Sequence, residues 1–121
     1  MLGYATLGSN DLEKAKAFYD TVLAPLGAQR AFGSDRMQGY ASANGGMLAV
    51  CTPYDGKAAT PGNGAMMALA ASSRELVDEV YNLALANGAT CEGQPGERMP
   101  TFYGAYFRDL DGNKLCVFKM G

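Results

Sequence analysis

Two segments of the chain carry apolar residues at helical spacing, at residues 11–23 and 74–86. Their apolar positions are Leu12, Ala15, Phe18, Tyr19, Val22 and Leu23, followed by Leu76, Val77, Val80, Tyr81, Ala84 and Leu85. Apolar residues recurring every three and four positions form one face of an amphipathic helix. A serine or asparagine, residues that favour N-caps, precedes each segment. The pattern therefore predicts two helices that each bury one face.

Short apolar runs bounded by turn residues surround both segments and are typical of strands. Around the first helix they are Gly3–Leu7, Arg30–Phe32, Met37–Ala43 and Met47–Cys51, and around the second Ala65–Ala70, Thr90–Glu92, Tyr103–Arg108 and Lys114–Phe118. Asn-Gly at 44–45 and Asp-Gly at 111–112 are strong hairpin signals. The order is β-α-β-β-β, read twice, which predicts an α+β fold.

The two halves also match each other in sequence. The segment LGSNDLEKAKAFYDTVL from Leu7 aligns without a gap on LAASSRELVDEVYNLAL from Leu69, and residues 40–46 overlay residues 106–112. Such self-similarity indicates one supersecondary unit used twice. A Gly- and Pro-rich segment, residues 52–64, joins the halves. We expect modules at 1–58 and 62–121 within a single domain over residues 1–121, because one half is too small to bury its own core.

These features resemble the vicinal oxygen chelate superfamily, which includes glyoxalase I, bleomycin-resistance proteins and extradiol dioxygenases. The matching stretches are TLGSNDLEKAKAFYDTVLAPLG, YDGKAATPGNGAMMALAASSRELVDEVYNLALANGA and YGAYFRDLDGNKLCVF, which together cover nearly the whole chain. The resemblance implies two βαβββ modules that form curled, cup-shaped mixed sheets, with helices on the convex side and a ligand on the concave side. It also implies that modules pair within or between chains, and we expect a homodimer.

Metal-dependent members of that superfamily hold their ion with histidine and glutamate on four strands. By resemblance, these positions fall at Tyr4, Met66 and Cys116, and within one residue of Val50. Tyrosine, methionine, cysteine and an apolar residue do not suit a hard divalent cation. We therefore expect no metal and no other cofactor.

Strand alternation indicates which side chains line the concave side. Their neighbours in each strand are then expected to point at the helices. The resulting candidates for ligand binding are Tyr4, Thr6, Met66, Ala68, Cys116 and Phe118, with Tyr40 and Tyr103 as additions to the wall. Few polar groups among apolar and aromatic side chains are typical of a small-molecule pocket. The alternative is that the same residues fill the concave side as core.

The amino-acid composition excludes several kinds of catalytic site and of partner. The chain of 121 residues has no histidine, which excludes Ser-His-Asp and Cys-His systems. A net charge of −2 and the absence of a basic run argue against a nucleic-acid partner, and no apolar run is long enough for a membrane span. No signal peptide is recognisable at the start. Three cysteines without metal-type spacing favour reduced thiols in the cytoplasm.

Two classes of function remain open from the sequence. The first is a metal-independent small-molecule-binding protein of the bleomycin-resistance type that holds an aromatic or amphipathic ligand. The second is a glyoxalase-like lyase or isomerase that uses a tyrosine or a carboxylate for acid-base chemistry on a small oxygenated substrate. No catalytic residue can be assigned. The absence of histidine and of the metal-ligand set favours binding.

Overall fold

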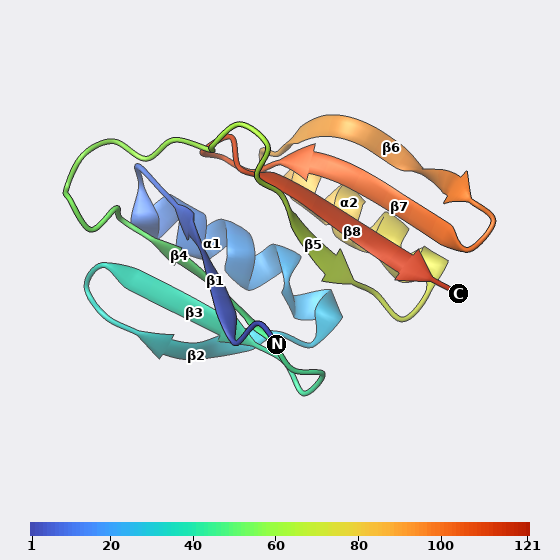
Figure 1. The fold of residues 1–121 in the computed structure, drawn as a ribbon, viewed down its shortest axis with the longest axis horizontal. Helices are drawn as coiled ribbons and strands as arrows, with labels where there is room; N and C mark the ends of the chain where they lie inside the picture. The colour runs from blue at the N-terminus through green and yellow to red at the C-terminus, as the bar shows by residue number, and fades with distance from the viewer.

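The computed structural model describes residues 1–121, and its elements run β-α-β-β-β twice (Figure 1). The first module contains β1 (Tyr4–Gly8), α1 (Leu12–Val22), the short 3-10 helix η1 (Ala24–Leu26), β2 (Gln29–Gly33), β3 (Met37–Ala41) and β4 (Met47–Cys51). The second contains β5 (Met67–Ala70), α2 (Arg74–Ala86), β6 (Thr90–Met99), β7 (Phe102–Arg108) and β8 (Lys114–Met120). The predicted α+β fold with a repeated βαβββ order is confirmed.

Each module folds into a four-stranded mixed sheet. The strand orders are β1-β4-β3-β2 and β5-β8-β7-β6, so β1 and β5 are edge strands. In each sheet one pair is parallel, β1 with β4 and β5 with β8, and the remaining pairs are antiparallel. Figure 1 shows α1 behind the first sheet and α2 behind the second. The two sheets remain open and are not joined into one by hydrogen bonds.

The helices begin at side-chain caps. Asp11 caps α1 by accepting a hydrogen bond from the Lys14 N–H at 3.2 Å, and Ser73 caps α2 by accepting one from the Leu76 N–H at 3.1 Å. Gly88 follows α2 with a positive φ of 103°, the conformation that favours glycine just after a helix. Neither helix is long and apolar enough to cross a bilayer.

Strand β6 is longer than the sequence pattern indicated. It runs from Thr90 to Met99, whereas the apolar pattern predicted only Thr90–Glu92. Its pairing with β7 is interrupted by register shifts, and Pro95 lies within it. Proline and glycine obscure the alternation of a strand, but an edge strand tolerates both because one side needs no partner.

The core is shared by both modules. One cluster of 18 buried residues joins the apolar faces of α1 and α2 with the sheet faces that the helices cover. Phe18 and Val22 contribute from α1, and Val77 and Val80 from α2, all nearly or fully buried. Each such side chain contributes about 1.5–3 kcal/mol when it leaves water. The helix faces predicted from periodicity are the faces that pack.

The turn between β7 and β8 docks onto the first module. The buried Asp109 carboxylate accepts the Tyr19 hydroxyl at 2.5 Å and the backbone N–H groups of Asp111 and Asn113 at 2.9 Å each. The Asn113 amide donates to the Gly8 carbonyl at 2.9 Å. Burial and the neighbouring Asp109 raise the pKa of Tyr19 well above its usual value, which keeps this hydroxyl a donor. A fully hydrogen-bonded carboxylate therefore ties the second sheet to α1 and β1.

We predict that Tyr19→Phe lowers the free energy of unfolding by about 1.5–3 kcal/mol, because it removes a buried hydrogen bond to a charged group. Urea denaturation measures the change. Tyr103→Phe is the matched control, since its hydroxyl donates to Asp78 at 2.7 Å in a more exposed setting. We expect the control to lose less than about 1 kcal/mol. Equal losses of unfolding free energy in the two variants would show that the buried hydrogen bond to Asp109 stabilises the fold no more than the more exposed one to Asp78.

Candidate functional site

The faces of the two sheets that point away from the helices are called here the concave faces. In β1, the pairings with β4 put Leu7 and Val50 on the helix side, so Tyr4 and Thr6 lie on the first concave face. In the second sheet, Leu115 and Val117 belong to the core on the helix side. Cys116 between them, and its partner Ala68, therefore lie on the second concave face. Residues that share these faces are Tyr4, Thr6, Phe32, Gly39, Met47, Ala49 and Cys51 in the first sheet, and Ala68, Ala70, Phe102, Gly104, Tyr106, Lys114, Cys116 and Phe118 in the second. The predicted residue Met66 precedes β5 and lines a cavity together with Lys114.

An aromatic ring covers a glycine on the first concave face. A Cβ at Gly39 would lie 2.4 Å from the ring of Phe32, so only glycine leaves room for that ring. Phe32 in turn meets Tyr4 edge to face, with ring centroids 6.0 Å apart. Aromatic pairs in this geometry are favourable beyond the area they bury. Phe32 thereby supplies an aromatic wall that the sequence pattern did not identify.

The second concave face has the same arrangement of an aromatic ring over a glycine. A Cβ at Gly104 would lie 2.9 Å from the ring of Phe102, and Phe102 stacks on Phe118 with centroids 5.4 Å apart and planes 6° apart. Phe118 was a predicted member of the face, whereas Phe102 was missed. Phe102 lies two residues before Gly104 on β7 and therefore on the same face, which is the signal that could have located it.

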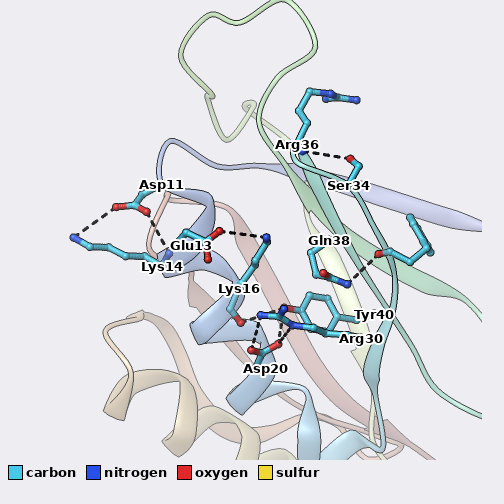
Figure 2. A network of polar contacts seen from close by, with 11 residues as sticks. Asp11, Glu13, Lys14, Lys16, Asp20, Arg30, Ser34, Arg36, Gln38 and Tyr40 are labelled. Carbon is cyan, nitrogen blue, oxygen red and sulfur yellow. Dashed lines mark hydrogen bonds and ion pairs between the residues drawn. The ribbon is translucent and has the colours of Figure 1, made fainter.

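Tyr40 does not lie on the concave wall, where it was predicted. Its ring is 2% exposed in the shared core, and its hydroxyl lies 2.9 Å from the Asp20 carboxylate and 3.1 Å from the Lys16 carbonyl on α1. Figure 2 shows Tyr40 and Arg30 both pointing toward Asp20. Hydrogen bonds from Arg30 lower the pKa of Asp20, and burial raises the pKa of Tyr40. These contacts hold Tyr40 on the helix side of β3.

The register of the strands also corrects the repeat alignment at Tyr40. In the structure Tyr40 pairs with Leu48 in the way that Phe107 pairs with Leu115. The repeat counterpart of Tyr40 is therefore Phe107 and not Tyr106, so the sequence alignment of residues 40–46 with 106–112 was one residue out of register. A shift of one residue in a strand moves every side chain to the other face.

Tyr103 was also predicted on the concave wall and lies on the other face. It pairs with Lys119, packs against the core and donates its hydroxyl to Asp78 on α2 at 2.7 Å. The guanidinium of Arg74 covers its ring at 5.1 Å. Strand alternation counted from Phe107, which is buried against the helices, puts Tyr103 on the same side. Tyr106 occupies the concave face instead.

Two cavities lie beside the sheets. A cavity of about 360 Å³ lies at the seam between the modules, where the edge strands β1 and β5 both line it. Its lining joins the concave-face residues Tyr4 and Ala68 with helix-side residues such as Tyr40, so of the predicted residues it contains these three. A second, more polar cavity of about 760 Å³ lies where the 60–66 segment passes over β7 and β8, and Met66 lines it together with Arg108 and Lys114. Both volumes fall within the range of small-molecule sites.

Comparisons with known proteins decide the family. The sequence profile of the Glyoxalase/Bleomycin resistance protein/Dioxygenase superfamily matches residues 1–117. The chain belongs to this superfamily. A search among curated proteins finds no match.

Solved structures agree with this membership of the glyoxalase/bleomycin-resistance superfamily. A glyoxalase/bleomycin resistance protein from Albidiferax ferrireducens T118 is 40% identical, with 98% of this chain and 97% of that one covered and a TM-score of 0.90. The fold is shared by a glyoxalase/bleomycin resistance protein/dioxygenase family enzyme from Burkholderia phytofirmans PsJN, which is 20% identical, with 98% of each chain covered and a TM-score of 0.81. It is also shared by a glyoxalase-related enzyme from Fulvimarina pelagi, which is 22% identical, with 98% of this chain and 86% of that one covered and a TM-score of 0.76.

The metal-ligand positions of the superfamily carry unsuitable side chains here. Tyr4 and Cys116 lie on the concave faces and Met66 lines a cavity, but Val50 points into the core, so its neighbour Cys51, which pairs with Gly8, faces the concave side instead. No group of three or more His, Cys, Asp or Glu side chains is arranged to hold a metal ion. A donor set of phenol, thioether and thiols does not fit the hard cations that carboxylates and imidazoles bind.

The thiol and the phenol on the second concave face, Cys116 and Tyr106, are held in their neutral forms. Burial raises the pKa of the Cys116 thiol, and burial together with Cys116 raises the pKa of the Tyr106 hydroxyl. A thiol acts as a nucleophile only as the thiolate. The face therefore offers apolar and aromatic surface for contact, with little reactive chemistry at neutral pH.

We predict that Met66→Trp changes the free energy of unfolding by less than about 0.5 kcal/mol, because Met66 is 42% exposed beside a cavity. Leu115→Trp is the control: Leu115 lies on the helix side of β8 and is fully buried. Overfilling the core at Leu115 should cost about 1–3 kcal/mol or more. Urea denaturation compares the two variants, and a large loss at both positions would show that residue 66 belongs to packed core.

Proposed function

We propose that this chain is a metal-independent small-molecule-binding protein that holds an aromatic or amphipathic ligand against its concave faces. The observation that carries the proposal is apolar surface left open beside two cavities. Tyr4 is 57% exposed and Phe32 and Met47 are each 36% exposed on these faces, and Met66 is 42% exposed beside the second cavity. Large exposed apolar patches in proteins mark sites of interaction with ligands or partners.

Metal independence follows from the donor set at the superfamily positions. Tyr4, Met66, Cys51 and Cys116 provide no carboxylate and no imidazole. Both cysteines are buried and free, and burial raises the pKa of Cys116, which opposes the thiolate form that metals bind. Free cysteines also support a cytoplasmic location for the protein.

A homodimer is the second part of the proposal. The unpaired edges of β1 and β5 and the exposed apolar residues of both concave faces leave surface that a second copy can cover. Two-fold pairing is the commonest way for identical chains to bury such surface. In the pair, the concave faces of the two copies would close around the ligand.

The lyase or isomerase alternative needs a group on the concave face that exchanges a proton near neutral pH. Tyr106 and Cys116 have pKa values raised above their ordinary values, so neither serves as a base there. The Asp109 carboxylate is occupied by hydrogen bonds from the Tyr19 hydroxyl and from its own turn. These observations favour binding over catalysis.

We expect a neutral aromatic probe, N-phenyl-1-naphthylamine, to bind saturably and to gain fluorescence. Chelator treatment followed by dialysis should leave the affinity unchanged, and elemental analysis should find well below one metal ion per chain. Met66→Trp should weaken binding by about tenfold or more because the larger ring fills the cavity. Met99→Trp is the control, since Met99 is exposed and lines neither cavity described above.

A loss of probe binding after chelation, restored by added Zn²⁺, Ni²⁺, Fe²⁺ or Mn²⁺, would contradict metal independence. Equal binding by wild-type protein and Met66→Trp would place the ligand elsewhere.

Light scattering at micromolar concentration should give twice the 12.7 kDa mass of one chain. Tyr4→Asp and Met47→Asp introduce charge into the proposed interface on the first concave face and should shift the mass toward the monomer. Glu13→Lys on the exposed side of α1 is a control that should leave the mass unchanged. A monomer mass for the wild-type protein would overturn the dimer.

A further inference from the structure

Two cations share one aromatic ring on the second concave face. The guanidinium of Arg98 lies 5.3 Å from the centroid of the Tyr106 ring, and the Lys114 ammonium lies 5.7 Å from it. Both distances are within the range of cation–π contacts. Cys116 lies beside the Tyr106 hydroxyl. Burial raises the pKa of its thiol, whereas the hydrogen bond with Tyr106 and the charges of Arg98 and Lys114 lower it. Two positive charges therefore lie against the Tyr106 ring on the second concave face.

Lys114 is the uncommitted member of this cluster. Arg98 donates to the carbonyls of Gly96 and Gln94, at 2.9 and 2.8 Å, which fixes its side chain. Arg108 is engaged with Glu92 at 2.6 Å and also donates to a carbonyl of the β7–β8 turn. The Lys114 Nζ makes no hydrogen bond and no ion pair, and it lies over the Tyr106 ring. All three of its N–H donors are therefore free to meet a ligand.

Lys114 and Arg108 both line the 760 Å³ cavity, whose other wall is the glycine-rich segment 60–66. Within this segment the backbone N–H groups of Gly62, Asn63 and Gly64 donate to no acceptor in the protein. Gly62 and Gly64 have positive φ values of 74° and 94°, which glycine adopts without strain. Unpaired backbone donors and two cationic side chains that line the same cavity form a concavity that suits an anion.

The two cations over the Tyr106 ring have no carboxylate partner. Neither Arg98 nor Lys114 forms an ion pair, whereas Arg108 pairs with Glu92. The carboxylates of the adjoining turn accept hydrogen bonds from the first module, Asp109 from the Tyr19 hydroxyl and Asp111 from the Asn10 N–H. Positive charge without a carboxylate partner beside low-dielectric walls raises the concentration of small anions there.

We propose that the second concave face recognises an anionic head group, a carboxylate or a phosphate, on the small molecule that the protein binds. Lys114 makes the direct charge-assisted hydrogen bond, the N–H groups of residues 62–64 complete the anion site, and Met66 with Tyr106 contacts the apolar body of the ligand. This inference rests on the proposed function, because it names the chemical class of ligand for the same concave surface.

The test compares three probes that share one aromatic body: 1-naphthoate, 1-naphthyl phosphate and the neutral 1-naphthalenemethanol. Isothermal titration gives the affinities, and ¹H–¹⁵N NMR of the full chain locates the contacts. We expect at least one anion to bind about tenfold or more tighter than the alcohol, with amide shifts at residues 62–64 and 114. Its affinity should fall as salt is raised, because ions screen the attraction.

Lys114→Met should abolish the preference for the anion, because anion affinity should fall to that of the alcohol, and Lys114→Arg should restore the preference. Lys119→Met is the matched control. Lys119 lies on the same strand but on the opposite face, opposite Tyr103, and its Nζ donates to the Met120 carbonyl at 2.7 Å. The control should bind all three probes as the wild-type protein does.

Equal binding of the anions and the alcohol would overturn this inference and leave the proposed binding function standing. Absence of binding for all three probes would overturn both. An anion preference that survives in Lys114→Met but is lost in Lys119→Met would also overturn it. Preference for naphthoate identifies a carboxylate ligand, and preference for naphthyl phosphate identifies a phosphate ester.

Discussion

The hydrogen bonds around Asp109 fix how the two modules sit relative to each other. This buried carboxylate accepts the Tyr19 hydroxyl from α1 and holds its own turn closed through two backbone N–H groups, while Asn113 of the same turn reaches the Gly8 carbonyl at the end of β1. A buried carboxylate is tolerated only when its oxygens are paired, so these contacts allow little displacement of the second sheet against the first. The shared core and the position of both concave faces depend on this junction.

The first module lacks this junction, and the difference explains where the seam cavity lies. Ser42 occupies the repeat position of Asp109, and Gly46 that of Asn113, by the register of β3 with β4 and of β7 with β8. Neither residue bonds across to the second module, and both line the 360 Å³ cavity opposite Ala68. One end of the seam is therefore closed by polar contacts, whereas the other end is open and apolar. Two modules of the same topology thus give an asymmetric surface at the seam.

Much of the fold and part of the site could be predicted from the sequence. The helices, the doubled βαβββ order and the orientation of Tyr4 and Cys116 follow from periodicity, because burial forces one face of each element inward. Tyr40 and Tyr103 were misplaced because a tyrosine suits either face of a sheet, and a shift of one residue in a strand exchanges the two faces. The cationic cluster over Tyr106, where we propose the anion site, was missed because Arg98 and Lys114 meet over this ring only when the irregular strand β6 is paired with β7. That pairing depends on bulges that no periodic pattern reveals.

In this member of the superfamily, as we propose, a cationic and aromatic surface for an anionic small molecule takes the place of metal ligation. A crystal structure of the protein grown with 4-bromobenzoate tests this proposal, since anomalous scattering locates the bromine without reference to a prior interpretation. We expect a bromine peak beside Met66 and a carboxylate within hydrogen-bonding distance of the Lys114 Nζ, with no metal ion between ligand and protein. A carboxylate bound to a metal ion among Tyr4, Cys51, Met66 and Cys116 would contradict it, as would a bromine found only at the seam between β1 and β5.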